Sequence, residues 1–198
     1  MEMPGERHKN AWRSEILARR SALSAEAHAR EAVALAEAVG KLEVSEWVCA
    51  YVPVRGEPGS TDMLDAVREA GARVLLPVIA APGPLEWAEY TGVDRLRPAR
   101  WGLWEPNGPS LPPEAIARAG LLLIPALAVD RRGVRLGRGA GHYDRSLGAV
   151  TPGARLMAVV RDDELLDRLP EEAHDIRLGW ALTPFGGEQR LGLDPRTE

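Results

Sequence analysis

The chain has 198 residues, of which 45% are hydrophobic and 27% are charged, and it contains one cysteine. This composition is that of a globular protein and excludes a disordered or fibrous chain, while a single cysteine excludes an intrachain disulfide and a cysteine-based zinc cluster. The formal net charge of -4 argues against general binding to nucleic acids or anionic membranes.

The first half of the chain predicts alternating helices and strands. In chain order, we expect a helix over residues 10–20, a helix from the N-cap Ser24 to Gly40, a strand over 47–52, a helix over 62–70, and strands over 74–79 and 85–90. Cys49 lies within the apolar run of 47–52, which indicates a small buried hydrophobic side chain.

The second half continues this alternation. In chain order, we expect a short helix that starts near Pro112, a very apolar strand over 121–125, an arginine- and glycine-rich loop, a helix over 141–147, a strand over 155–160 and a helix over 163–169, with no regular element after about residue 186. Continuously apolar strands that alternate with helices are typical of a parallel sheet covered on both faces. We therefore predict the α/β class: a single three-layer domain over residues 1–198, with a mainly parallel sheet and helices on both faces.

The loop from Arg135 to Arg145 carries the strongest chemical signal. Its glycines 137, 139 and 141 allow backbone N–H groups to approach an anion closely, and the helix that follows adds partial positive charge. Residues 130–145 contain five arginines against two aspartates in an otherwise acidic chain, which indicates a small anion such as a nucleotide phosphate rather than a polymer. A solvated, flexible loop is the alternative.

Other common sites are excluded by inspection. The chain has no G-x-S-x-G elbow, no H-E-x-x-H motif and no Walker sequence, and its four histidines lack metal-ligand spacing. The glycine loop is not a Rossmann fingerprint, because its third required glycine falls on His142 and no predicted strand leads directly into Gly137.

Several short motifs recur in a fixed order along most of the chain. They are Lys9 with Arg13, Arg19-Arg20, Leu23-Ser24, Tyr51-Val52-Pro53 with Glu57, Leu76-Pro77-Val78, Gly102 with Glu105-Pro106, Val129-Asp130 with Gly133 and the segment 135–145, and Pro170-Glu171 with His174-Asp175. In this order and spacing they resemble the 5-formyltetrahydrofolate cyclo-ligase family, also called methenyltetrahydrofolate synthetases.

The resemblance implies an α/β enzyme that converts 5-formyltetrahydrofolate to 5,10-methenyltetrahydrofolate with ATP as co-substrate and Mg²⁺ as cofactor, releasing ADP and phosphate. It assigns ATP binding to Lys9, Arg13, Arg135, Leu136, Gly137, Arg138, Gly139, Ala140, Gly141, His142 and Tyr143. It assigns folate binding to Val52, Glu57, Arg138, His142 and Tyr143, to which we add Trp101 for stacking on a flat ring. Catalysis then falls to Lys9, Arg138 and Arg145, and magnesium binding to Asp144 and Asp175.

Each of these residues has a simpler interpretation. Asp144 suits the first turn of a helix without any metal, His174-Asp175 suits a turn, and Lys9 and Glu57 suit solvated charges. Trp101 and Trp104 suit ordinary packing.

The sequence also departs from the family pattern, with His142 in place of a usual tyrosine, a loop after Glu57 that is one residue longer, and Glu164 in place of a common glutamine. His142 and the altered loop after Glu57 motivate the second hypothesis, a non-catalytic relative that binds folate or nucleotide.

The expected partners are two small molecules, ATP and a reduced folate. RNA binding is disfavoured by the acidic balance and the absence of an interleaved aromatic platform, and no apolar run approaches the ~20 residues of a membrane span. We expect a monomer, and a cytoplasmic location because the first ten residues lack the apolar core of a signal peptide.

Overall fold

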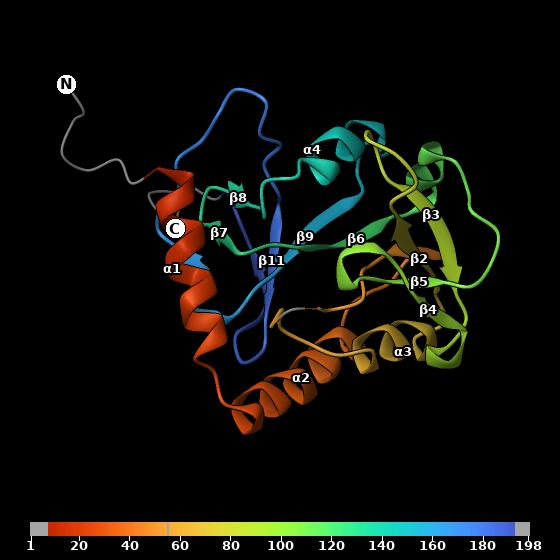
Figure 1. Ribbon diagram of the computed structural model, residues 1–198, viewed down its shortest axis with the longest axis horizontal. Helices are drawn as coiled ribbons and strands as arrows, with labels where there is room; N and C mark the ends of the chain where they lie inside the picture. The colour runs from red at the N-terminus through yellow and green to blue at the C-terminus, as the bar shows by residue number, and fades with distance from the viewer. Residues whose placement is uncertain (1–7, 55, 193–198) are drawn as a thin grey trace.

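The computed structural model describes residues 8–54 and 56–192. Its central sheet contains, in spatial order, β12 (Gly187–Arg190), β11 (Trp180–Thr183), β9 (Arg155–Val159), β6 (Leu121–Pro125), β1 (Trp47–Cys49), β2 (Arg73–Val78) and β3 (Glu86–Tyr90) (Figure 1). The strands from β11 to β2 pair in parallel, whereas the edge strands β12 and β3 are antiparallel to their neighbours. The mainly parallel sheet confirms the predicted fold class.

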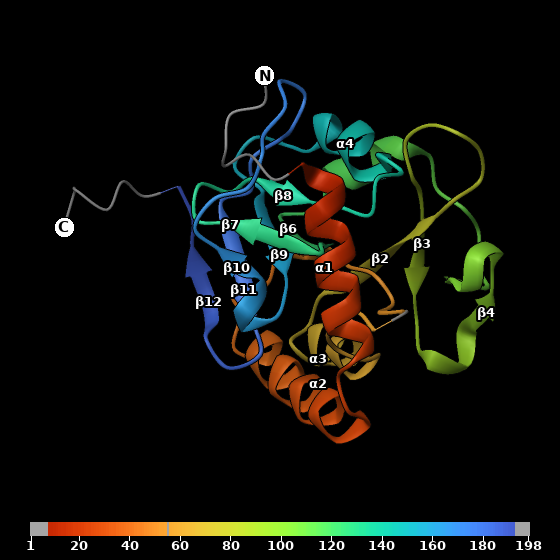
Figure 2. The same cartoon turned by 60° about the vertical axis from the view of Figure 1, so that its left-hand side comes forward.

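Two apolar clusters cover the two faces of this sheet. On one face, α2 (Ala25–Gly40) and α3 (Asp62–Glu69) pack against alternate strand residues, among them Leu121 and Leu123. On the other face, the 3-10 helix η3 (Pro113–Arg118) and residues around Leu147 pack against Leu122 and Ile124. Figure 2 shows α2 and α3 on the opposite side of the sheet from α4 (His142–Ser146). Helices therefore lie on both faces, as predicted.

A second, three-stranded sheet joins the N-terminal helix to the body. It consists of β10 (Leu165–Leu166), β7 (Ala128–Asp130) and β8 (Arg135–Leu136). The helix α1 (Lys9–Ser21) runs beside β7 and β8 (Figures 1 and 2), where its buried Ile16 packs against Leu127 and Leu136. This packing brings the N-terminal end of the described chain to the arginine- and glycine-rich loop.

Three predictions about elements are wrong. Residues 163–169 are not a helix: the short η5 (Asp162–Glu164) leads into β10, because the Glu164 carboxylate accepts the Arg161 N–H and turns the chain. After residue 186, β12 forms a strand that pairs with β11 through its backbone, although its polar sequence does not indicate a strand. Residues 193–198 lie outside the described part. A strand does lead directly into Gly137, namely the two-residue β8.

The helix cap at Ser24 was predicted from the sequence, whereas the hairpin over residues 96–106 was not. The Ser24 cap is confirmed, since its hydroxyl accepts the Ala27 N–H at 3.1 Å. The β-hairpin of β4 (Leu96–Pro98) and β5 (Trp104–Pro106) was not predicted, and Figure 2 shows it at the margin of the molecule beyond β3. Within the described ranges, no helix combines the length and apolar character needed to cross a membrane.

Candidate active site

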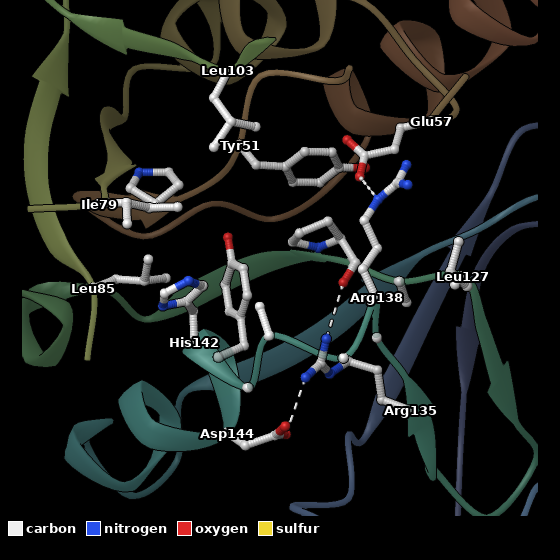
Figure 3. A pocket seen from close by; sticks show the side chains of 18 of the residues that line it. Tyr51, Glu57, Ile79, Leu85, Leu103, Leu127, Arg135, Arg138, His142 and Asp144 are labelled. Carbon is white, nitrogen blue, oxygen red and sulfur yellow. Dashed lines mark hydrogen bonds and ion pairs between the residues drawn. The ribbon is translucent and has the colours of Figure 1, made fainter. Parts of the chain in front are cut away.

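A cavity of about 480 Å³ opens at the carboxyl ends of the central strands. Its wall includes Tyr51 and Val52 after β1, Ile79 after β2 and Leu127 after β6, together with the segment after β8 (Figure 3). Ligands of open parallel sheets bind at this edge, because the connecting loops there are free to vary while the strands hold them in place.

The glycine loop enters this cavity as a turn that only glycine adopts easily. Gly139 and Gly141 have φ angles of 104° and 71°, in the left-handed region, and Gly141 directly precedes α4. The Nε of Arg13 donates to the Gly137 carbonyl oxygen at 2.9 Å, so α1 holds the loop in place. Because α4 has only five residues, an anion at this loop would be held by the loop amides and nearby cations more than by a helix dipole.

Two arginines of the loop are each paired with a carboxylate. Arg135 donates to Asp144 at 3.0 Å and to the Pro125 carbonyl oxygen at 3.3 Å, and its guanidinium lies 5.6 Å from the centre of the Tyr143 ring. Arg138 donates through Nε to Glu57 at 3.3 Å (Figure 3). The Arg138–Glu57 pair therefore links the glycine loop to the loop after β1.

The Lys9 ammonium group approaches from α1 and forms a second link. Its Nζ lies 2.8 Å from Asp175 and 3.1 Å from Glu172. Burial lowers the pKa of Lys9, but the hydrogen bonds to these two carboxylates raise it more, so the pKa lies above its usual value. Burial raises the pKa of Asp175, and the hydrogen bonds from Lys9 and the Glu172 N–H outweigh it, so this carboxyl has a lowered pKa.

Most of the predicted site residues line this one cavity. They are Lys9, Arg13, Val52, Glu57, Trp101, Arg135, Gly137, Arg138, Gly139, Ala140, Gly141, His142, Tyr143, Asp144 and Asp175. They come from segments up to 166 positions apart, as the Lys9–Asp175 contact shows.

Two predicted residues lie elsewhere. Leu136 alternates with Arg135 along β8, so its side chain points away from the cavity and packs into the core beside Ile16. Arg145 is directed at backbone, donating to the carbonyl oxygens of Gly83 at 3.3 Å and Ala140 at 2.9 Å. The structure thus gives neither side chain a place in the cavity wall, and Arg145 instead ties the glycine loop to the loop before β3.

The two predicted magnesium ligands also differ in their surroundings. Asp175 belongs to a cluster in which it, Glu172 and His174 each present a ligand atom within 4.8 Å of the others. Asp144 lies in the cavity wall but outside that cluster, paired with Arg135.

Sequence reasoning missed the apolar part of the wall. Leu85, Leu103, Ile79 and Leu127 line it, and Tyr51 runs across it toward Glu57 (Figure 3). Only the position of Ile79 at the end of the predicted strand 74–79, and of Leu127 just beyond the predicted strand 121–125, signalled them in advance.

The two tryptophans of the β4–β5 hairpin occupy the outer part of the wall. Trp101 is 58% exposed and has a positive φ of 58°, and Trp104 is 45% exposed. Large aromatic side chains left this open at a cavity mouth are suited to stack on a flat ligand.

Comparison with known proteins identifies the family. The sequence model of the 5-formyltetrahydrofolate cyclo-ligase family matches residues 6–184. The chain belongs to this family. It is therefore an enzyme, and the cavity described above is its candidate active site.

Individual relatives agree with this assignment. A 5-formyltetrahydrofolate cyclo-ligase of Mycolicibacterium smegmatis is 48% identical over 187 residues, which cover 91% of this chain and 96% of that protein. A 5,10-methenyltetrahydrofolate synthetase of Aquifex aeolicus has a similar fold, with a TM-score of 0.76, 24% identity, and 96% and 95% of the two chains covered. The corresponding synthetase of Mycoplasma pneumoniae has a TM-score of 0.70 at 19% identity, covering 88% of this chain and 98% of its own.

Proposed function

We propose that this enzyme converts 5-formyltetrahydrofolate to 5,10-methenyltetrahydrofolate, using ATP and Mg²⁺ and releasing ADP and phosphate. The observation that carries the proposal is that one cavity joins a cationic, glycine-rich wall to an apolar and aromatic wall. The first wall suits a triphosphate, and the second suits a folate ring. Family membership supports the same reaction.

The phosphates of ATP are assigned to the cationic wall. Lys9, Arg13, Arg135 and Arg138 surround the glycine loop, and the open backbone around Gly139 allows amides to reach phosphate oxygens. In the structure three of these cations have carboxylate partners, so a phosphate group binds by replacing those partners.

The folate is assigned to the opposite wall. Val52 and the apolar side chains bound the ring, Trp101 stacks at the mouth, and His142 and Tyr143 contribute further lining of the same cavity. The Glu57 carboxylate accepts the Val54 N–H at 3.0 Å and retains acceptor capacity for ring N–H groups.

The reaction needs an activated formyl oxygen, because a formamide oxygen is a weak nucleophile and a poor leaving group. Transfer of the γ-phosphoryl group from ATP to that oxygen forms an O–P bond and releases ADP. N10 then attacks the formyl carbon and loses its proton to solvent, the C–O bond breaks, and phosphate departs with the former formyl oxygen. The chain contributes mainly by holding the two substrates in line and by offsetting charge with Arg138 and Lys9.

The donor groups of the cavity fit Mg²⁺. This ion prefers oxygen ligands and takes one or two carboxylates together with phosphates, and Asp144 and Asp175 both line the cavity. When bound there, Mg²⁺ would neutralise charge on the ATP phosphates. Since Arg135 and Lys9 hold these carboxylates in the structure, metal binding would free both cations for phosphate.

Formation of the methenyl chromophore tests the proposal. The protein is incubated with 5-formyltetrahydrofolate, ATP and MgCl₂, and the absorbance of the product is followed, with reactions lacking ATP or containing EDTA as controls. We expect product only in the complete mixture, and loss of turnover in Arg138→Ala. Folded wild-type protein that gives no product would favour the non-catalytic relative instead.

The remaining expectations belong to the same proposal. ATP and a reduced folate are the partners of this site, with no nucleic acid or membrane, and the protein acts as a cytoplasmic monomer. Gel filtration tests the monomer directly, and a dimer at working concentration would contradict it.

A further inference from the structure

The three tyrosines of the chain differ in how their hydroxyl groups are satisfied. Tyr90, in β3, donates to the Asp65 carboxylate at 3.0 Å. The hydroxyls of Tyr51 and Tyr143 are buried and have no hydrogen-bond partner among the residues that the structure describes. Both unpartnered tyrosines line the cavity, and Tyr90 does not.

Tyr51 is the more informative of the two. It is 3% exposed and lies two residues beyond the end of β1, so its ring has a fixed place in the wall. A buried hydroxyl without a partner has lost its water hydrogen bonds and gained nothing in exchange, which is why such groups are rare in folded proteins. An orphaned hydroxyl on a cavity wall is therefore expected to find its partner on the ligand.

The surroundings of Tyr51 indicate what that partner is. Figure 3 shows its ring extending toward the Glu57 carboxylate, whose two oxygens accept from Val54 and Arg138. Burial and the nearby negative charge of Glu57 raise the pKa of Tyr51 well above its usual value, so the phenol stays protonated and able to donate. The Tyr51 hydroxyl is thus a hydrogen-bond donor beside an acceptor, the Glu57 carboxylate. Such a pair is complementary to a ring edge that carries an oxo oxygen next to N–H groups.

We infer that Tyr51 is a substrate-binding residue whose hydroxyl donates a hydrogen bond to an oxo oxygen on the heteroaromatic ring of the folate, beside the Glu57 carboxylate. This inference rests on the proposed function, since it places the folate ring against this wall. Tyr51 then contributes to folate affinity and has no part in ATP binding, because the phosphates are assigned to the glycine loop whereas Tyr51 belongs to the wall that follows β1.

The inference is tested by comparing Tyr51→Phe with the matched control Tyr90→Phe. Each change removes one phenolic oxygen and keeps the ring, but Tyr90 loses a hydrogen bond within the protein whereas Tyr51 loses none. Folate affinity is measured by quenching of tryptophan fluorescence with 5-formyltetrahydrofolate, ATP affinity by calorimetry, and stability by the midpoint of urea unfolding.

We expect Tyr51→Phe to bind the folate about 10-fold more weakly, to bind ATP like the wild type, and to unfold at the same or a higher urea concentration. Tyr90→Phe should bind folate normally and unfold at a lower concentration. A Tyr51→Phe protein that binds folate as tightly as the wild type would overturn this inference alone. Failure of the wild type itself to bind the folate would overturn the proposed function, and this inference with it.

Discussion

At the scale of single residues, three cations of the cavity are held by internal carboxylates. Lys9 is paired with Asp175, Arg135 with Asp144, and Arg138 with Glu57. In the function proposed above these cations bind phosphate, and the pairs restrict their long side chains beforehand, which lowers the rotamer entropy that binding would cost. The cations are therefore positioned before the ligand arrives, and replacing any of them should affect ligand binding more than stability.

The two lysines of the chain provide a matched test of this idea. Lys9→Ala should raise the KM for ATP by about 10-fold or more, because a charge-assisted hydrogen bond to phosphate is lost. Lys41→Ala should leave it unchanged, since Lys41 follows α2 and does not line the cavity. Steady-state kinetics at saturating folate measures both values, and equal values for the two variants would contradict the role of Lys9.

The Lys9–Asp175 pair also predicts a pH dependence of stability. The pKa of Asp175 is lowered in the folded protein, so its contribution is present above the unfolded carboxyl pKa of about 3.9 and is lost as the pH falls through the folded value. The difference in unfolding free energy between wild type and Asp175→Asn should be constant from about pH 6 to 8 and shrink below about pH 4. Urea unfolding in EDTA across this range measures it, and a difference that grows on acidification would contradict the assignment.

At the scale of elements, a buried ion pair joins α1 to the turn that precedes β10. Arg20 donates to both oxygens of Glu164, at 2.7 and 2.8 Å, and both side chains are almost fully buried. Burial lowers the pKa of Arg20, but its bonds to Glu164 raise it above the usual value. Glu164 in addition accepts the Arg161 N–H, so one carboxylate both shapes the turn between β9 and β10 and joins it to α1.

Removing this carboxylate should be costly. Glu164→Ala should lower the free energy of unfolding by about 3–5 kcal/mol, because the buried Arg20 charge would lose its carboxylate partner. The matched control is Glu89→Ala, which breaks the exposed pair with Arg73 and should cost about 1 kcal/mol or less. Urea unfolding at pH 7 measures both changes in unfolding free energy. Comparable losses in the two variants would contradict the conclusion that the buried pair contributes more to stability than an exposed one.

The glycine loop predicts a binding defect rather than an unfolding defect. Gly139→Ala places a side chain at a φ of 104°, which costs about 1–2 kcal/mol or displaces the loop from its conformation. ATP affinity should therefore fall by about 10-fold. The control Gly148→Ala has ordinary φ and open space for a methyl group, so it should bind ATP normally. Calorimetric titration with ATP distinguishes them; unchanged affinity in Gly139→Ala would contradict the assigned role of the loop.

Elements with a strong local signal were predictable. The strand over 121–125 coincides with β6, since it is apolar throughout and buried on both faces, and the Ser24 cap marks the start of α2. The segment 163–169 was misread because Leu165, Leu166 and Leu169 have helical spacing. In the structure Leu166 and Leu169 pack in the cluster of Ile16 from α1, whereas Leu165 points the other way along β10 and packs against a cluster of the central sheet. The edge strand β12 carries no hydrophobic pattern, because it pairs with β11 through backbone hydrogen bonds and through polar contacts such as those of Gln189 with Thr183 and of Arg190 with the Trp180 ring.

At the scale of the whole molecule, the site exists only because distant segments meet at one edge of the sheet. Motif order indicated which residues take part, but neither the Lys9–Asp175 contact nor the Arg138–Glu57 contact has a local signal. The apolar wall and the unpartnered Tyr51 hydroxyl likewise depend on tertiary packing. The residue types that take part in the site could thus be predicted from the sequence, whereas the contacts between them could be seen only in the folded structure.

The central claim is that ATP phosphorylates the formyl oxygen within this cavity and that ring closure expels that oxygen as phosphate. It is tested most directly with 5-formyltetrahydrofolate carrying ¹⁸O in the formyl group, by mass spectrometry of the phosphate released with ATP and MgCl₂. We predict one ¹⁸O atom in the phosphate for each methenyl product formed. Methenyl product accompanied by unlabelled phosphate, or no ATP-dependent product at all, would contradict the account.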